Sequence, residues 1–206
     1  MNEHRLAWLL FLGGTALLGQ TAPGLDPGFF LKDPKTIMVV CADKARAQRP
    51  DDSRMLAEFG RIYLAAGLRD RALDAFQRAA RLGKRDAATH ALIAKAWLTQ
   101  GAKAEALAAA KQAAELAPRN EAILGPLGVQ FTDAGFPVEG NGFMEQAYAA
   151  APTDWEMAVA FGRACLRNKN PDLAAVWFRH ALTGRSGDEK VYTVVGLAYA
   201  DRGARP

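Results

Sequence analysis

Similar residue types recur every 34 residues from Ser53 onward in this 206-residue chain. Written in rows of 34 that begin at positions 53, 87, 121, 155 and 189, the sequence stays in register without insertion or deletion. Column 8 of these rows contains only small residues: Gly60, Ala94, Gly128, Gly162 and Gly196. Column 11 contains mostly aromatic residues: Tyr63, Trp97, Phe131, Cys165 and Tyr199. A fixed period of this length predicts a row of stacked units that bury their apolar faces against one another.

Other columns repeat just as regularly. Alanine dominates columns 20 and 27, and proline occurs at column 32 in two rows, as Pro118 and Pro152, and at the corresponding place before the first row, as Pro50. Column 24 contains Phe76, Ala110, Met144 and Phe178. Together these columns resemble the tetratricopeptide repeat, whose W-x2-L-G-x2-Y…A-x3-F…A…P pattern has this period. The resemblance implies an all-α fold, an α-solenoid of stacked antiparallel helix hairpins wound into a right-handed superhelix, and the lack of alternating apolar and polar runs agrees with it.

The rows also divide the chain. We assign full repeats to residues 53–86, 87–120, 121–154 and 155–188, and half repeats to residues 33–52 and 189–206. Gly67, Gly101 and Gly135 at column 15 are expected to end the first helices, because glycine adopts the left-handed conformation at little cost. We expect columns 4, 7, 11 and 24 to fill the space between the two helices of each repeat. Column 34 offers an acid or amide to cap each following helix: Asp52, Asp86, Asn120, Asp154 and Asp188.

The first residues resemble an export signal. Arg5 lies in a short polar start, and the apolar run at 6–19 (LAWLLFLGGTALLG) is short for a membrane span and suits a signal-peptide core. We assign residues 1–22 to a signal peptide or an uncleaved signal anchor and residues 23–32 to a linker. The protein is therefore expected in the periplasm or on the cell envelope, and no nucleic-acid partner is expected there, since the repeats also offer no regular aromatic stacking ladder.

No residue pattern indicates an enzyme. The sequence has no HExxH, CxxC, phosphate-binding loop or paired-carboxylate arrangement, so we expect no catalysis, cofactor or metal. Cys41 and Cys165 are expected to be buried free thiols, because several helix layers of about 8–10 Å separate them. His90 falls at an apolar packing column, where we expect a partly buried, hydrogen-bonded side chain, and His180 is expected on the surface.

The third repeat departs from the pattern. Pro126 lies beyond the first turn of its helix, where proline costs about 3 kcal/mol or bends the helix. We therefore predict a bend or a late helix start near Gly125. Gly140 and Gly142 fall inside the second helix of this repeat, where each glycine costs about 1 kcal/mol relative to alanine. The third hairpin is expected to be the softest, either as a hinge for a partner or through sequence drift.

The resemblance also implies a binding groove. In this family the first helices line the inner face of the superhelix, mainly through columns 2, 5, 9 and 12, and that face binds peptides or partner helices. The candidate groove residues are cationic and aliphatic: Arg54, Arg61, Leu64, Lys95, Leu98, Val129, Arg163 and Leu166. They suit a protein or peptide with acidic and apolar side chains, which predicts an adaptor or scaffold in a cell-envelope assembly. The alternative is that the cations are ordinary solvated residues.

The last row stops after its first helix. Tyr192, Val195 and Tyr199 occupy packing columns for which this row supplies no second helix. Three explanations are open: the helix caps the array imperfectly, the chain was cut short, or the helix docks on a partner or on a second copy of the chain. The docking explanation gives an alternative function, in which the protein is a permanent structural subunit of a secretion, pilus or membrane-assembly complex.

Overall fold

The computed structural model of the protein describes Gly28, residues 31–185 and residues 187–203. These ranges contain ten α-helices and no β-strand. The helices are α2 (Pro34–Gln48), α3 (Ser53–Ala65), α4 (Arg69–Leu82), α5 (Ala87–Leu98), α6 (Lys103–Leu116), α7 (Glu121–Asp133), α8 (Pro137–Ala150), α9 (Trp155–Arg167), α10 (Pro171–Gly184) and α11 (Glu189–Gly203). Their bounds follow the rows of 34, since α3, α5, α7, α9 and α11 each begin at the first column.

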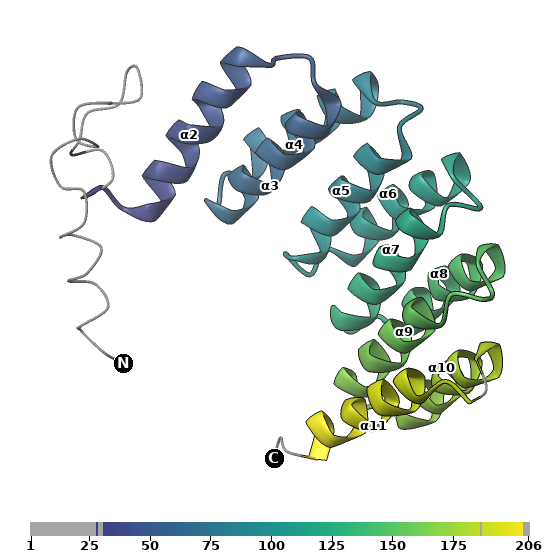
Figure 1. Cartoon of the computed structure of the whole chain (residues 1–206). Helices are drawn as coiled ribbons and strands as arrows, with labels where there is room; N and C mark the ends of the chain where they lie inside the picture. Colours follow the sequence, from purple (N-terminus) through teal and green to yellow (C-terminus); the bar gives the residue numbers. More distant parts are fainter. Residues whose placement is uncertain (1–27, 29–30, 186, 204–206) are drawn as a thin grey trace, which may run out of the picture.

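The helices form consecutive hairpins that stack in a curved row (Figure 1). Within the hairpins α3 packs on α4, α5 on α6, α7 on α8 and α9 on α10. The first helices also stack on one another in the order α3, α5, α7, α9 and α11, while α2 packs against α3. In Figure 1, α2 lies at one end of the row and α11 at the other. The predicted all-α solenoid of helix hairpins is confirmed.

The core of each hairpin comes from the columns that the repeat reserves for apolar side chains. In the four full repeats these side chains are buried: Leu56, Phe59, Tyr63, Phe76, Ile93, Trp97, Leu124, Leu127, Phe131, Met144, Phe161, Cys165 and Phe178. Phe76 of the first hairpin also contacts Trp97 of the second, with ring centroids 5.2 Å apart. Aromatic side chains therefore hold a hairpin together and join it to the next one, as a stacked array requires.

Polar contacts between second helices repeat with nearly the same spacing. Arg69 pairs with Glu105 at 3.2 Å, and Lys103 pairs with Glu139 at 2.7 Å, 36 residues apart in each case. Because all four side chains are substantially exposed, each pair contributes no more than about 1 kcal/mol. These pairs therefore help to set the register of neighbouring hairpins and add little to the stability of the fold.

Most of the predicted N-caps form. The side chains of Asp52, Asp86 and Asp154 accept hydrogen bonds from backbone N–H groups in the first turns of α3, α5 and α9, at 3.0, 3.2 and 2.9 Å. Asn120 occupies the cap position of α7, but its side chain makes no such bond. The negative charge of Glu121 in the first turn still favours this helix start.

Left-handed residues end the first helices, as predicted. Gly67, Gly101 and Gly135 have φ values of 83°, 67° and 86°. The fourth repeat has Lys169 at the same column, with a φ of 57°, and it is the one non-glycine residue with positive φ in the described ranges. A side chain in this conformation costs about 1 kcal/mol or more, so the turn between α9 and α10 is strained where the earlier turns are relaxed.

The helix that contains Pro126 begins at Glu121 and continues to Asp133, so the predicted late start near Gly125 is wrong. Proline removes the hydrogen bond to the carbonyl of Ala122, but both residues are exposed and water can replace the missing donor. The loss is therefore smaller than in a buried helix. The predicted bend at Gly125 remains a prediction.

The two glycines of α8 have different surroundings. A Cβ atom on Gly140 would lie 2.1 Å from Thr132 Oγ1 and 2.7 Å from the carbonyl oxygen of Gly128, whereas a Cβ atom on Gly142 would have nothing within 4 Å. Gly140 thus lets the backbones of α7 and α8 cross closely, which no side chain would permit. Gly140 has a low helix propensity, but the close packing of α8 against α7 requires a glycine at this position.

Three expectations about single side chains need correction. Cys165 is buried and Cys41 is exposed, so the prediction of two buried thiols is wrong for Cys41, because the described helices that contact α2, which are α3 and α4, leave Cys41 uncovered. His90 is buried, yet its Nε2 makes no hydrogen bond, contrary to prediction. His180 is half-buried, not on the open surface, and its ring lies 4.7 Å from that of Tyr148. Both cysteines are free thiols, as expected.

The predicted export signal at 1–22 lies outside the described residues, as does most of the predicted linker at 23–32. Among the helices that the structure describes, none is long and apolar enough to cross a membrane.

Candidate functional site

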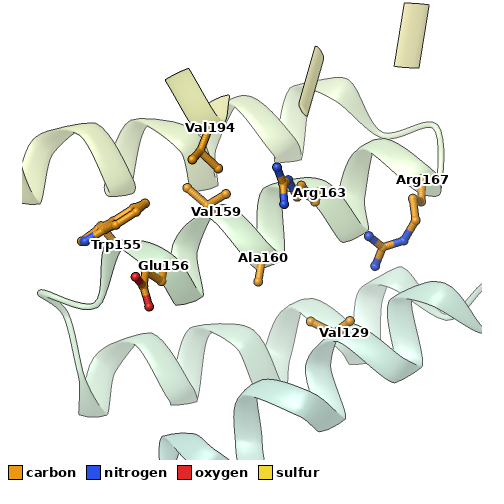
Figure 2. Close-up of a pocket in the computed structure, with 8 residues that line it drawn as sticks. All are labelled: Val129, Trp155, Glu156, Val159, Ala160, Arg163, Arg167 and Val194. Carbon is orange, nitrogen blue, oxygen red and sulfur yellow. The ribbon is translucent and has the colours of Figure 1, made fainter. Parts of the chain in front are cut away.

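The first helices bring together a pocket near the C-terminal end of the row. Its volume is about 290 Å³, and it lies between α7, α9 and α11 (Figure 2). The lining residues are Val129, Trp155, Glu156, Val159, Ala160, Arg163, Arg167 and Val194. We call this the α9 pocket. In Figure 2 Val159 and Val194 face each other across it, while Trp155 and Glu156 lie together at one end.

Arg163 and Glu156 are the charged groups of the α9 pocket whose side chains make no hydrogen bond or ion pair with a described residue. The Nε of Arg163 is buried and makes no hydrogen bond, and the guanidinium forms no ion pair with any described residue. A buried guanidinium N–H without an acceptor is costly, which makes this group suited to bind an external carboxylate. Arg167 differs, since it donates two hydrogen bonds to Asp133 at 2.9 and 2.7 Å.

The two predicted groove cations of the first repeat are already paired with acids. Arg54 donates two hydrogen bonds to Asp86, at 2.8 and 3.1 Å, and Arg61 donates to Glu58 at 2.7 Å. The hydrogen bonds from Arg54 lower the pKa of the Asp86 carboxyl to about 2, and the same contact raises the pKa of Arg54. These two predicted groove residues therefore offer less charge to a partner than their sequence columns imply.

The other predicted groove residues fall into two groups. Lys95 is exposed and has no partner among the described residues, and Val129 lines the α9 pocket. Leu64, Leu98 and Leu166 at column 12 are 6–7% exposed and belong to the core. Column 12 therefore supplies packing, and the aliphatic surface of the pocket comes from other columns.

A second pocket adjoins the α9 pocket and shares Trp155, Glu156 and Val194 with it. Its volume is about 600 Å³, and the further lining residues come from the α10–α11 turn and α11: Arg185, Asp188, Glu189, Lys190 and Thr193. Because acids and bases both line this second pocket, its charge gives no clear preference for one type of ligand.

Solved structures with a similar fold are tetratricopeptide-repeat proteins. TTC0263, a thermophilic tetratricopeptide-repeat protein of Thermus thermophilus, matches with 19% identity and a TM-score of 0.51 over 81% of this chain and 91% of its own. The MamA protein matches with 19% identity and a TM-score of 0.50 over 74% of this chain and 83% of its own. This chain has the tetratricopeptide-repeat fold. No protein-family model and no curated protein matches the sequence.

Sequence reasoning missed part of the α9 pocket. Trp155, Val159 and Val194 are apolar lining residues at columns 1, 5 and 6. Columns 1, 5 and 9 are four residues apart and share one face of a helix, so Trp155, Val159 and Arg163 could have been grouped by helical spacing. Val194 could not, because its contribution depends on how α11 packs against α9.

The residues predicted to dock a partner lie on α11, away from the α9 pocket lining. Tyr192 and Tyr199 are 54% and 42% exposed, and Val195 is half-buried. The tetratricopeptide fold therefore presents two separate candidate surfaces, one polar and concave and one apolar at the end of the row. In the described ranges no group of three His, Cys, Asp or Glu residues could hold a metal ion.

Proposed function

We propose that the protein is a non-catalytic scaffold whose α9 pocket binds a segment of another protein with one carboxylate beside apolar side chains. The carboxylate accepts hydrogen bonds from Arg163, and an aliphatic side chain packs between Val159 and Val194. Lys95, two repeats away on the same column, extends the positive charge along the first helices. The observation that supports this assignment above all is the buried, unpartnered Nε of Arg163 in a pocket whose other lining residues are mostly apolar.

Binding can be tested with two synthetic peptides, one in which Glu and Asp alternate with Leu and Val, and one in which Gln and Asn replace the acids. Isothermal titration calorimetry at low salt should show a preference of at least about tenfold for the acidic peptide. Arg163→Gln should remove the preference. Arg61→Gln is the matched control and should keep it, because Arg61 is already paired with Glu58. Equal binding of both peptides by the wild-type protein would refute the proposal.

We further propose that the protein works in the bacterial cell envelope, where the apolar run at 6–19 directs it. Fractionation of cells that produce the full chain with a C-terminal tag should recover it outside the cytoplasm. Recovery in the cytoplasm would contradict this location without affecting the pocket. A permanent structural subunit of an envelope complex remains the second candidate, because Tyr192 and Tyr199 are exposed at the end of the row.

A further inference from the structure

Independently of the α9 pocket, we propose that α11 binds one amphipathic helix of another protein through Tyr192, Val195, Gly196 and Tyr199, here called the C-terminal face. The partner helix presents Ala or Gly, then Phe or Met four residues later, then Ala three residues after that. It takes the place of a second helix and completes a fifth hairpin.

The C-terminal face consists of the same columns that are buried in the four complete hairpins. At column 4, Leu56, Leu124 and Ala158 are 0% exposed, whereas Tyr192 is 54% exposed. At column 11 the exposed fraction is 0–4% in the complete repeats and 42% for Tyr199. The difference arises because each earlier first helix is covered by its own second helix, and no described helix covers α11 on that side.

Gly196 supplies the shape of the site. In the first and fourth hairpins, a Cβ atom at column 8 would lie 2.3–2.4 Å from the ring of Phe76 or Phe178, and in the third hairpin 2.6 Å from Met144. The large side chain at column 24 therefore rests directly on the column 8 glycine. At Gly196 nothing lies within 4 Å of the same point. The notch that receives Phe or Met is present on α11 and has no occupant within the described chain.

The contact of α11 with the preceding hairpin is already complete. The Tyr199 ring lies 5.4 Å from Phe178, which matches the 5.2 Å between Trp97 and Phe76 at the first junction between full hairpins. Trp97 is 4% exposed because α6 also covers it. Tyr199 contacts the second helix of the preceding hairpin, as Trp97 does, but no described second helix covers it from the other side. The C-terminal face is therefore the same surface that each complete hairpin buries.

The pattern required of the partner comes from the second helices themselves. Ala72, Phe76 and Ala79 of α4 pack on α3, and α10 has the same residues at the same columns. Small residues at columns 20 and 27 allow close approach on either side of the large one. A helix of this type with a polar opposite face would bury its apolar stripe on α11 and keep its polar side in water.

A second copy of the chain does not offer such a helix in its described part. The column 24 side chains of α4, α6, α8 and α10 are all buried in their own hairpins. In α2, for which the structure describes no preceding partner helix, column 24 is Ala42, which is too small to fill the notch and is 1% exposed. No described helix is therefore free to fill the notch, and we assign the face to a helix of another protein.

The probe is a fluorescein-labelled, acetylated and amidated peptide with the sequence of residues 69–82, which is the sequence of α4. Fluorescence anisotropy with the full chain should give a dissociation constant on the order of 100 µM, weakened by the cost of folding the isolated peptide. A peptide with Phe76→Ala, and a protein with Gly196→Leu, should each bind at least about tenfold more weakly. Leu197→Ala is the matched control, since it removes an exposed side chain beside the notch and should leave binding unchanged.

The variant Gly196→Leu lies on an exposed helix and should fold, which circular dichroism can verify. Arg163→Gln should bind the peptide normally, which separates this site from the α9 pocket. Equal binding by Gly196→Leu, or no binding at about 1 mM peptide, would overturn the proposal. Sedimentation that shows a dimer dissolved by Gly196→Leu would also overturn it, because a second copy would then occupy the face.

Discussion

Gly128 in the third hairpin and Gly196 in the last helix occupy the same column of the repeat, but their surroundings are opposite. A Cβ atom at Gly128 would lie 2.6 Å from Met144 Cγ and 2.9 Å from the carbonyl oxygen of Gly140, and at Gly196 it would have nothing within 4 Å. The period of 34 specifies glycine in both places. The helix that covers the column, not the column itself, decides whether this glycine is required for stability.

The third hairpin is the tighter case even among the closed ones. At Gly60 and Gly162 the nearest atoms belong to phenyl rings, which can tilt away from an added methyl group. At Gly128 and Gly140 backbone atoms face each other, and a backbone cannot move without displacing its helix. The effect of an added methyl group on stability should therefore differ most between a glycine of α8 and a glycine of α11.

The largest effect is expected for Gly140→Ala. The added methyl group meets Thr132 and the backbone of α7, so the free energy of unfolding should fall by about 3 kcal/mol. Gly142→Ala in the same helix has open space and should raise it by about 0.5 kcal/mol, since alanine favours a helix. Urea unfolding of the full chain measures both. Similar effects of the two variants would show that propensity, not crossing distance, governs this hairpin.

A smaller effect than that of Gly140→Ala, and a gain in stability, is expected for Lys169→Gly. Lys169 holds a φ of 57° at the column where Gly135 and two other glycines relax the earlier turns. The substitution should raise the free energy of unfolding by about 1 kcal/mol, because glycine adopts this conformation without a steric penalty. Gly135→Lys is the reciprocal change and should lower it by about as much. If Lys169→Gly is neutral in urea unfolding, the strain assigned to the α9–α10 turn is absent.

These expectations separate what a repeat pattern can predict from what it cannot. Helix bounds, caps and core columns follow from residue type and period, so α3 to α11 and their buried side chains were predictable. The role of Gly140 was not, because its requirement comes from the distance between two backbones. The periodic sequence gives the residues on each face but not the angle at which the faces cross.

The same limit applies to the groove. Arg54, Arg61, Lys95 and Arg163 read alike as cations on the inner face, and the structure divides them by partner. The pairing of Arg54 with Asp86 depends on side-chain rotamers at the starts of two neighbouring helices, which a column alignment does not encode. Trp155 and Val194 meet for a similar reason, because α9 and α11 place different columns side by side.

Gly196→Ala tests the open end of the comparison. Alanine replaces glycine on an exposed helix face with no atom in the way, so the free energy of unfolding should rise by about 0.5 kcal/mol. Gly60→Ala, at the same column beneath Phe76, should lower it. Urea unfolding again gives both values. A loss of stability in Gly196→Ala would mean that something covers this face in solution, which is the sign of self-association.

The smallest effect concerns the junctions between repeats and their response to pH. Arg54 and Asp86 join α3 to the start of α5, whereas the corresponding columns at the last junction are Glu156 and Asp188, two acids that line one pocket. The pKa of Asp86 is about 2 in the folded chain, below its ordinary value near 4. The pair therefore stabilises the fold above about pH 4, and this contribution is lost as pH falls toward 2.

Asp86→Asn keeps a side-chain oxygen for the cap and removes the charge. Wild type should exceed this variant in the free energy of unfolding by up to about 1 kcal/mol at neutral pH, and the gap should close between about pH 4 and pH 2. The α9–α11 junction has no Arg–Asp pair at these columns, so we expect no matching loss of stability there on acidification. Hydrogen exchange resolves the two junctions separately. If amide protection at α5 and α11 falls in parallel on acidification, the Arg54–Asp86 pair does not make the α3–α5 junction more sensitive to pH than the α9–α11 junction.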